Sequence, residues 1–322
     1  IPLPIRGSPF EGWGQNVRIC SNWAFVPMTM RECSTMIQTG EPGDKTAADA
    51  IVIGAMRAGT TALYRVFLES GLVAVPECKE TDFYLSKENF ARGLGWYRKQ
   101  FGNSDLPWVD FCPNYTKRDM FPGAPARTYE NAPNSKLIFI ARDPVARAES
   151  QYKHTFMHSA SLAEPADVFD THEGEHILMV SKYAYQLEPY FEYWSKDDIL
   201  IVDFNDLLAN SSSVFRRIAE HIGLAPSAVE HLSNLPEANS GEEIRKMPRW
   251  WGQMRDTGMG RYVRSRTPRV LIDSLRAAVK TRKPVEVPEF DDRIRSNLAQ
   301  KLKTDASRFR ELTGKPFRSW SV

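Results

Sequence analysis

The chain has 322 residues, which is enough for one large domain or two small ones with a sizeable core. Hydrophobic residues make up 42% and charged residues 25%, so the composition excludes a disordered chain, a coiled coil and a collagen-like fibre. Its 42 basic and 40 acidic residues give a formal net charge of +2, unlike a nucleic-acid coat or a polybasic membrane binder.

The ends of the chain and its cysteines leave the compartment open. The sequence begins at Ile1 rather than Met, which we interpret as a fragment of a longer protein. None of the four cysteines belongs to a C-x-x-C pair, so we predict neither a zinc site nor a thioredoxin-type redox motif. Their disulfide state stays open; they are Cys20, Cys33, Cys78 and Cys112.

The first part of the chain, residues 1–48, lacks clear periodicity and is expected to be an irregular N-terminal arm to a domain over residues 49–322. Short apolar runs typical of buried parallel strands occur at 49–54, 137–141 and 198–203, and a further short strand is expected around 73–75. Helices are expected at 60–70, 144–158, 177–195, 212–222 and 290–312. Strands that alternate with helices predict a single α/β domain with a central parallel sheet flanked by helices.

A glycine loop joins the first strand to the first helix. In the segment from Gly54 to Thr61, backbone N–H groups and a helix N-terminus are expected to point at one spot, which suits a phosphate-like anion. The loop is P-loop-like, but Thr60 occupies the position of the lysine of the nucleoside-triphosphate motif and the cation is Arg57. A shorter anion such as a phosphosulfate fits this chemistry. The alternative is a simple glycine turn with Arg57 in solvent.

A second anion clamp is predicted where the strand at 137–141 ends. Arg142 lies at its carboxyl end, where open α/β sheets bind ligands. Asp143 suits an N-cap and Pro144 the first helical position, and Ser150 follows about two turns later. The guanidinium and the hydroxyl are expected to hold a second phosphate. The alternative is an arginine paired to a nearby carboxylate.

Together these segments resemble the PAPS-dependent sulfotransferases, in the Golgi-type and bacterial carbohydrate-sulfotransferase-like branch; PAPS is 3′-phosphoadenosine 5′-phosphosulfate. Residues 57–63 look like the family's 5′-phosphosulfate loop, and Arg142 to Ser150 like its 3′-phosphate motif. Residues 76–84 and 109–115 are similar to its Lys-Glu-x-x-Phe-Phe and acceptor-strand segments. The resemblance covers roughly residues 48–318. The sequence departs from the family in having Arg57 for the usual lysine and Asp110 for the usual glutamate.

The resemblance implies a role for each matching residue. The expected PAPS-binding residues are Arg57, Ala58, Gly59, Thr60, Thr61, Ala62, Arg142, Ser150, Arg282 and Lys283. Glu80 is the expected general base, supported by Lys79 and His154. The expected acceptor-binding residues are Asp110, Tyr115, Phe83 and Tyr84. For Lys79 and His154 a plain surface role is an equal alternative, for Glu80 an exposed loop position is the alternative, and the aromatic residues are equally typical of core.

The sequence thus predicts a sulfotransferase that moves a sulfo group from PAPS, in line, to a hydroxyl or amine of a small-molecule or glycan acceptor. One alternative is a nucleotide or small-molecule kinase, and another is a pseudo-enzyme that binds 3′-phosphoadenosine 5′-phosphate (PAP). Trp250 and Trp251 are expected in a lid or a sugar-stacking surface, with loop packing as the alternative. Both the Golgi lumen and the cytoplasm are compatible with the sequence.

Overall fold

The computed structural model describes residues 47–158, 162–232 and 287–322. Almost all of the predicted arm lies outside these residues, as do Trp250, Trp251, Arg282 and Lys283. The predictions made for them are therefore not addressed by the structure.

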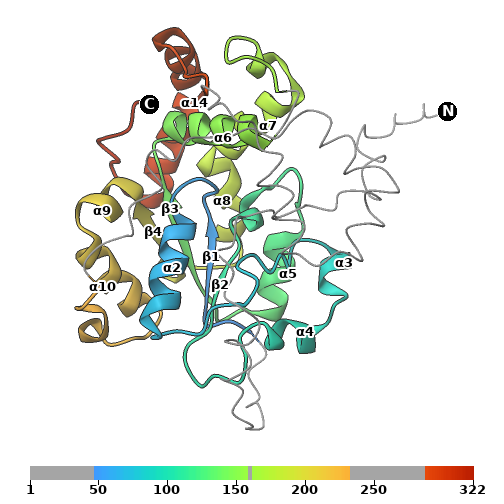
Figure 1. The fold of residues 1–322 in the computed structure, drawn as a ribbon, viewed down its shortest axis with the longest axis vertical. Helices are drawn as coiled ribbons and strands as arrows, with labels where there is room; N and C mark the ends of the chain where they lie inside the picture. The colour runs from blue at the N-terminus through green and yellow to red at the C-terminus, as the bar shows by residue number, and fades with distance from the viewer. Residues whose placement is uncertain (1–46, 159–161, 233–286) are drawn as a thin grey trace, which may run out of the picture. The chain divides into compact units, whose positions relative to one another are not determined.

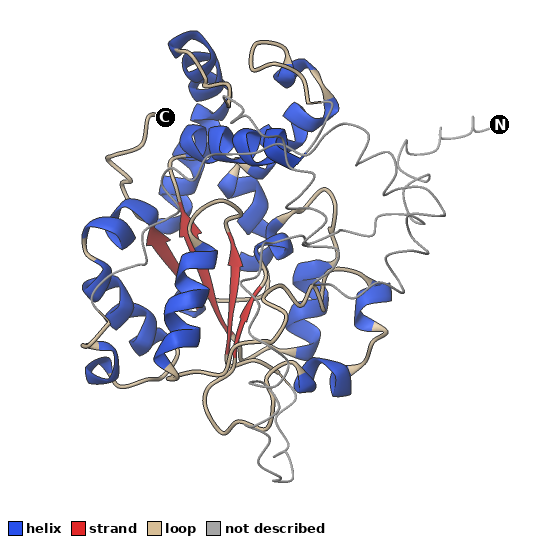
Figure 2. Cartoon of the chain, in the orientation of Figure 1, coloured by secondary structure: helices blue, strands red, loops and turns tan. Residues whose placement is uncertain are grey.

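The centre of the fold is a four-stranded parallel sheet in the order β2-β1-β3-β4. The strands are β1 (Ala50–Gly54), β2 (Val109–Phe111), β3 (Lys136–Ala141) and β4 (Ile199–Asp203). All four arrows in Figure 2 point the same way. Three of these strands coincide with the predicted apolar runs, so the α/β class with a parallel sheet is confirmed.

The helices connect the strands and cover the sheet (Figure 1). The α-helices are α2 (Thr60–Ser70), α3 (Lys87–Phe90), α4 (Leu94–Lys99), α5 (Ala124–Asn131), α6 (Pro144–His158), α7 (His172–Val180), α8 (Tyr183–Phe191), α9 (Phe204–Ala209), α10 (Ser211–His221) and α14 (Asp292–Thr313). Single 3₁₀ turns are η2 (Pro113–Thr116), η3 (Val168–Asp170), η4 (Lys196–Asp198) and η5 (Pro226–Val229). No described helix is long and apolar enough to cross a lipid bilayer.

The order of the strands creates a switch point at the carboxyl edge of the sheet. From β1 the chain continues to β2 on one side, whereas from β3 it continues to β4 on the other. The segments that leave β1 and β3 therefore diverge, and the space between two such strand ends is where open α/β sheets bind ligands. The two predicted anion clamps are the segments that leave β1 and β3.

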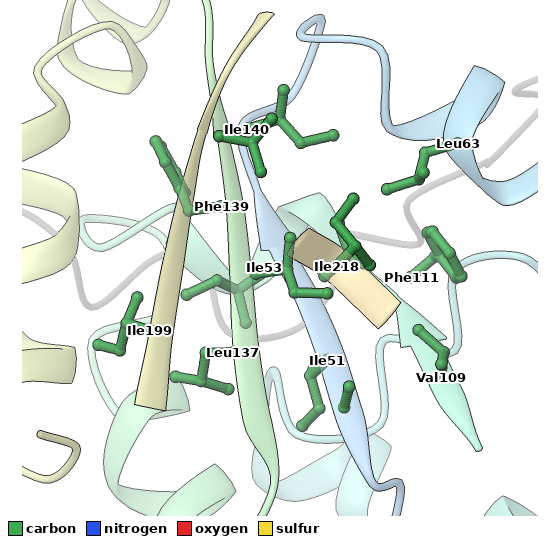
Figure 3. Close-up of a cluster of buried hydrophobic side chains, with 14 of the residues drawn as sticks. Ile51, Ile53, Leu63, Val109, Phe111, Leu137, Phe139, Ile140, Ile199 and Ile218 are labelled. Atoms are coloured by element: carbon green, nitrogen blue, oxygen red, sulfur yellow. The ribbon is translucent and has the colours of Figure 1, made fainter. Parts of the chain in front are cut away.

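Both faces of the sheet are buried, which explains the continuous apolar runs of the strands. On one face, Tyr64 of α2 makes an edge contact with Phe111 of β2, with ring centroids 5.4 Å apart. On the other, Phe139 of β3 contacts Tyr183 of α8 at 5.3 Å and Phe309 of α14 at 6.1 Å. Figure 3 shows the strand side chains of this core at close range.

Helix boundaries agree with the predictions where the chain carries a local signal. Helix α2 begins and ends as predicted, with Gly71 in the left-handed conformation at its C-cap, and Gly314 caps α14 in the same way. The Asp143 carboxylate accepts a hydrogen bond from the Ala146 N–H at 2.8 Å, which confirms the N-cap of α6.

Two predictions of secondary structure were wrong. The helix expected over 177–195 is two helices, α7 and α8, separated at Ser181 and Lys182. The Ser181 hydroxyl donates to the Ile177 carbonyl, and the N-terminus of α8 is capped by Asp305 from α14, so tertiary contacts set this break. The strand expected around 73–75 is a single bridge between Ala74 and Trp108.

Candidate active site

The loop after β1 has the geometry of an anion-binding turn. Arg57 and Gly59 both adopt the left-handed conformation, with φ of 69° and 87°. No side chain caps the N-terminus of α2, where Gly59 is the N-cap residue, so the first N–H groups of the helix remain available. Free N–H groups at the positive end of a helix dipole favour a phosphate or sulfate group.

Gly59 is also required by packing. A Cβ atom at this position would lie 2.8 Å from the ring of Phe204, the first residue of α9. The Arg142 guanidinium carbon lies 5.1 Å from the centroid of the same ring, within cation–π range. Phe204 therefore contacts both predicted anion clamps, and the close approach at Gly59 keeps the two together.

The structure brings together the key side chains of the two clamps. The Arg57 guanidinium donates through Nε to the Ser150 hydroxyl at 3.3 Å. Arg142 donates through Nη1 to the carbonyl of Arg57 at 3.2 Å. These contacts join positions 85 and 93 residues apart in the sequence. The expectation that both clamps share one edge of the sheet is thus met, while anion binding by them stays a prediction.

A third arginine, Arg147, supports the same edge and was not predicted. It lies on α6 with no exposed surface. Its guanidinium donates to the Gln151 side-chain oxygen at 2.7 Å, the Ile177 carbonyl at 2.7 Å and the Ser181 hydroxyl at 2.9 Å. It also reaches the carbonyl of Met56, in the anion loop, at 3.5 Å.

These three arginines concentrate positive charge at the sheet edge. Burial and the charge of Arg142 lower the pKa of Arg57 to about 10. Burial lowers the pKa of Arg147 to about 10. The charge of Tyr183 opposes this shift, and the two other guanidinium groups reinforce it. Within the described residues, none of the three forms an ion pair with a carboxylate. Buried unpaired charge is costly, and a bound anion would relieve that cost.

Glu80 lies in the segment that precedes α3, beside the end of β2. Its carboxylate accepts a hydrogen bond from the Lys79 ammonium at 2.8 Å and from the Asn114 amide at 3.3 Å. Both charged side chains are about 10% exposed. The surface-residue alternative for Lys79 and Glu80 is therefore wrong, whereas their catalytic roles stay predictions.

Two further titratable residues on this side of the site were not predicted. Lys117 follows the 3₁₀ turn after β2, and burial lowers its pKa, while the charges of Glu80 and Asp82 oppose that shift. His176 of α7 has its pKa lowered to about 4 by burial and by the nearby positive charges of Lys117 and Arg147. His176 is consequently neutral at physiological pH.

The residues expected to bind the acceptor lie in a buried layer beside the Glu80 segment. Asp110, Tyr115, Phe83 and Tyr84 are at most 1% exposed. The Phe83 ring stacks on Tyr97 with centroids 4.6 Å apart and also contacts Tyr84 and Phe90. Side chains packed this way are also typical of core and contact the Glu80 segment at Thr81 and Tyr84, while acceptor binding by these residues stays a prediction.

The remaining predicted residues lie at the edges of the clamps. Ala58 and Thr60 are buried, whereas Thr61 and Ala62 are half-buried in the first turn of α2. His154 is half-buried on α6, one turn beyond Ser150. Figure 1 shows α6 and α7 lying beyond the ends of the strands, over the edge that carries the clamps.

The fold and this edge define a class of protein: an open parallel α/β sheet whose switch point, the place where such sheets bind ligands, carries two arginines and an uncapped helix N-terminus. A family model described as "Sulfotransferase domain" matches residues 47–264, which is more than half of the chain. The chain therefore belongs to the sulfotransferase domain family, and the family predicted from the motifs is confirmed.

Curated relatives are heparan sulfate sulfotransferases. The chain is 27% identical over 197 residues to mouse bifunctional heparan sulfate N-deacetylase/N-sulfotransferase 4, a match that covers 55% of this chain and 22% of that protein. It is 26% identical over 189 residues to mouse heparan sulfate glucosamine 3-O-sulfotransferase 5, covering 55% of this chain and 54% of that protein. The matched region is thus only about a fifth to a half of these relatives.

Among solved structures, the sulfotransferase from Alicyclobacillus acidocaldarius superimposes with a TM-score of 0.57. The superposition covers 86% of this chain and 99% of that chain at 17% identity. At this identity the likeness establishes the shared fold.

The close approach at Gly59 gives a stability prediction with a matched control. Gly59→Ala should destabilise the protein more than Gly71→Ala, because both residues have positive φ but a Cβ atom at Gly71 meets nothing within 4 Å. Placing an alanine at positive φ costs about 1 kcal/mol of stability in both variants. The collision with Phe204 adds to this cost only at Gly59. Urea unfolding measures both free energies, and equal losses would contradict the packing role of Gly59.

Proposed function

We propose that this protein is a sulfotransferase that moves a sulfo group from PAPS to a hydroxyl or amine of an acceptor, with Glu80 as general base. The observation that carries the proposal is the meeting of Arg57, Arg142 and Ser150 at the switch point of the sheet. These groups lie beside an uncapped helix N-terminus, and among the described residues no carboxylate forms a close ion pair with either arginine, although Asp143 and Glu149 act on Arg142 from a greater distance.

The residues at this edge fit PAPS in charge and in placement. Arg57 and the N–H groups of residues 58–62 would hold the 5′-phosphosulfate, as expected at a helix N-terminus. Arg142 and Ser150 would hold the 3′-phosphate, since a guanidinium and a hydroxyl together supply charge-assisted hydrogen bonds. When bound, PAPS supplies the sulfuryl group and a phosphate leaving group.

Glu80 has the chemistry of a general base. A carboxylate offers about four acceptor positions, and the hydrogen bonds from Lys79 and Asn114 use two of them. The unused lone pairs are free to accept the proton of an acceptor hydroxyl or amine as it attacks. Lys79, Arg57 and Lys117 are the cations placed to stabilise negative charge that develops during transfer.

The acceptor that the relatives favour is a saccharide. Their names describe transfer to heparan sulfate, to nitrogen in one case and to the 3-oxygen of glucosamine in another. We propose the same class of acceptor for this chain, a glycan hydroxyl or amine, on the strength of that similarity. The small-molecule acceptors considered from the sequence are the alternative for an acceptor screen.

Replacement of Glu80 should separate catalysis from donor binding. Glu80→Gln removes the proton acceptor but keeps the shape of the side chain and its contact with the Asn114 amide. The value of kcat should therefore fall by about 10² to 10⁴. The Kd for PAP should change by less than about twofold, because the arginine clamps are untouched. Steady-state kinetics and calorimetry measure the two quantities.

Glu77→Gln is the matched control, because Glu77 lies in the same segment with an exposed side chain. Its kcat should equal that of the unmodified protein. If Glu80→Gln retained full turnover, Glu80 would not be the base.

The Arg142 clamp should recognise the 3′-phosphate of PAP. Arg142→Ala should weaken binding of PAP by about tenfold to a hundredfold, the cost of a charge-assisted hydrogen bond or two, and should leave AMP nearly unaffected. Arg65→Ala, at an exposed arginine on α2, is the control and should alter neither affinity. Equal losses for PAP and AMP would show that Arg142 contacts another part of the nucleotide.

A further inference from the structure

One carboxylate beneath the site is buried without a compensating charge. Asp110 is the middle residue of β2 and has no exposed surface. Its Oδ2 atom accepts three hydrogen bonds, from the Thr81 hydroxyl at 2.9 Å, the Tyr97 hydroxyl at 3.1 Å and the Tyr115 hydroxyl at 3.2 Å. Its Oδ1 atom has no hydrogen-bond partner in the part of the chain that the structure describes.

The surroundings of Asp110 contain no cation that pairs with it among the described residues. The titratable groups that act on it are neutral or acidic; they are Tyr84, Tyr97, Tyr115, Asp82, Cys78 and Cys112. Burial raises the pKa of Asp110 to about 6, against the three hydroxyl hydrogen bonds, which lower it.

This charge reduces the stability of the fold at neutral pH. The pKa of Asp110 is raised above its unfolded value near 4, so the folded protein favours the protonated form of this side chain. The stability that comes from the protonated form is fully present below about pH 4 and is lost as the pH rises through about 6. A purely structural position would be served better by an uncharged side chain of the same shape. A carboxylate kept here at such a cost points to a role in the reaction.

The hydrogen bonds of Asp110 lead to the candidate base. Thr81 immediately follows Glu80, and its hydroxyl, held by Asp110, also accepts a hydrogen bond from the Phe83 N–H at 3.4 Å. The Tyr115 hydroxyl accepts a hydrogen bond from the Tyr84 N–H at 3.3 Å. Asp110 thus fixes the backbone directly after Glu80, while Asn114 holds the Glu80 carboxylate itself.

We propose that the ionised Asp110 carboxylate is a positioning group for Glu80, which acts through Thr81 to aim the base at the acceptor. The proposal rests on the proposed function of Glu80. Misplacement of a reacting group by about 1 Å can cost up to a hundredfold in rate, so loss of this anchor should appear in kcat rather than in PAP binding.

Asp110→Asn tests the proposal, because the amide keeps the shape and removes the charge. At pH 7.5 the variant should keep or raise its midpoint of thermal unfolding and keep its Kd for PAP, while kcat falls by at least about tenfold. In the unmodified protein kcat should rise with increasing pH, with an apparent pKa of about 6. The variant should lack this rise. A parallel fall in stability and activity would overturn the proposal in favour of a structural role.

A second pair of variants keeps the proposal testable should Asp110→Asn fail to fold. Thr81→Val and Tyr97→Phe each remove one of the three hydrogen bonds to Oδ2, but only Thr81 adjoins Glu80. Thr81→Val should lower kcat by at least about fivefold more than Tyr97→Phe, and Thr81→Ser should restore it, because the hydroxyl returns. Equal effects of Thr81→Val and Tyr97→Phe would overturn the proposal.

Glu80→Gln, assayed beside these variants, distinguishes the role of Glu80 as base from the role of Asp110 in positioning it. An inactive Glu80→Gln together with a fully active Asp110→Asn removes the positioning role and leaves the proposed function intact. A fully active Glu80→Gln removes the base itself, and the role of Asp110 with it.

Discussion

The site depends on one constraint. The fold gathers positive charge at one place and does not neutralise it. Arg57, Arg142 and Arg147 converge on the carboxyl edge of the sheet, and hydrogen bonds to neutral oxygens hold all three. A carboxylate at this place would satisfy the charge and occupy the anion site. Neutral partners fix the guanidinium groups while leaving their charge for a ligand, which is how a preorganised anion site differs from a structural ion pair.

The sheet order explains why this charge gathers in one place. Because β1 and β3 are neighbours whose following segments diverge, the glycine loop and the Arg142 segment face one another across the switch point. Phe204 packs against Gly59 and beneath Arg142, so the start of α9 completes the same edge. On the β2 side, the Glu80 segment rests on a buried layer that includes Asp110, Tyr97 and Tyr115. Glu80, the proposed base, and the two predicted anion clamps therefore rest on neighbouring strands of one sheet.

The sequence predicts what short-range signals determine. Apolar runs, the Asp143 cap and the glycine at position 71 specify three strands and the ends of two helices, and the spacing of Arg142 and Ser150 predicts the second clamp. Arg147 has no such signal, because an arginine on a helix is typical of a surface until Gln151 and Ser181 are seen around it. Asp110 is matched to the acceptor through the family resemblance of residues 109–115, and a three-residue strand does not reveal that both faces of the sheet are covered.

A nucleotide that carries both a 3′-phosphate and a 5′-phosphate is the ligand proposed for this edge, and thermal unfolding in the presence of ligands is the first measurement to make. PAP, AMP and Mg-ATP should be compared side by side, since a ligand at a hundred times its Kd adds about 2.7 kcal/mol of stability. PAP should raise the unfolding midpoint without added metal, and far more than AMP does. Stabilisation by Mg-ATP with no effect of PAP would rule out this ligand and would favour a kinase.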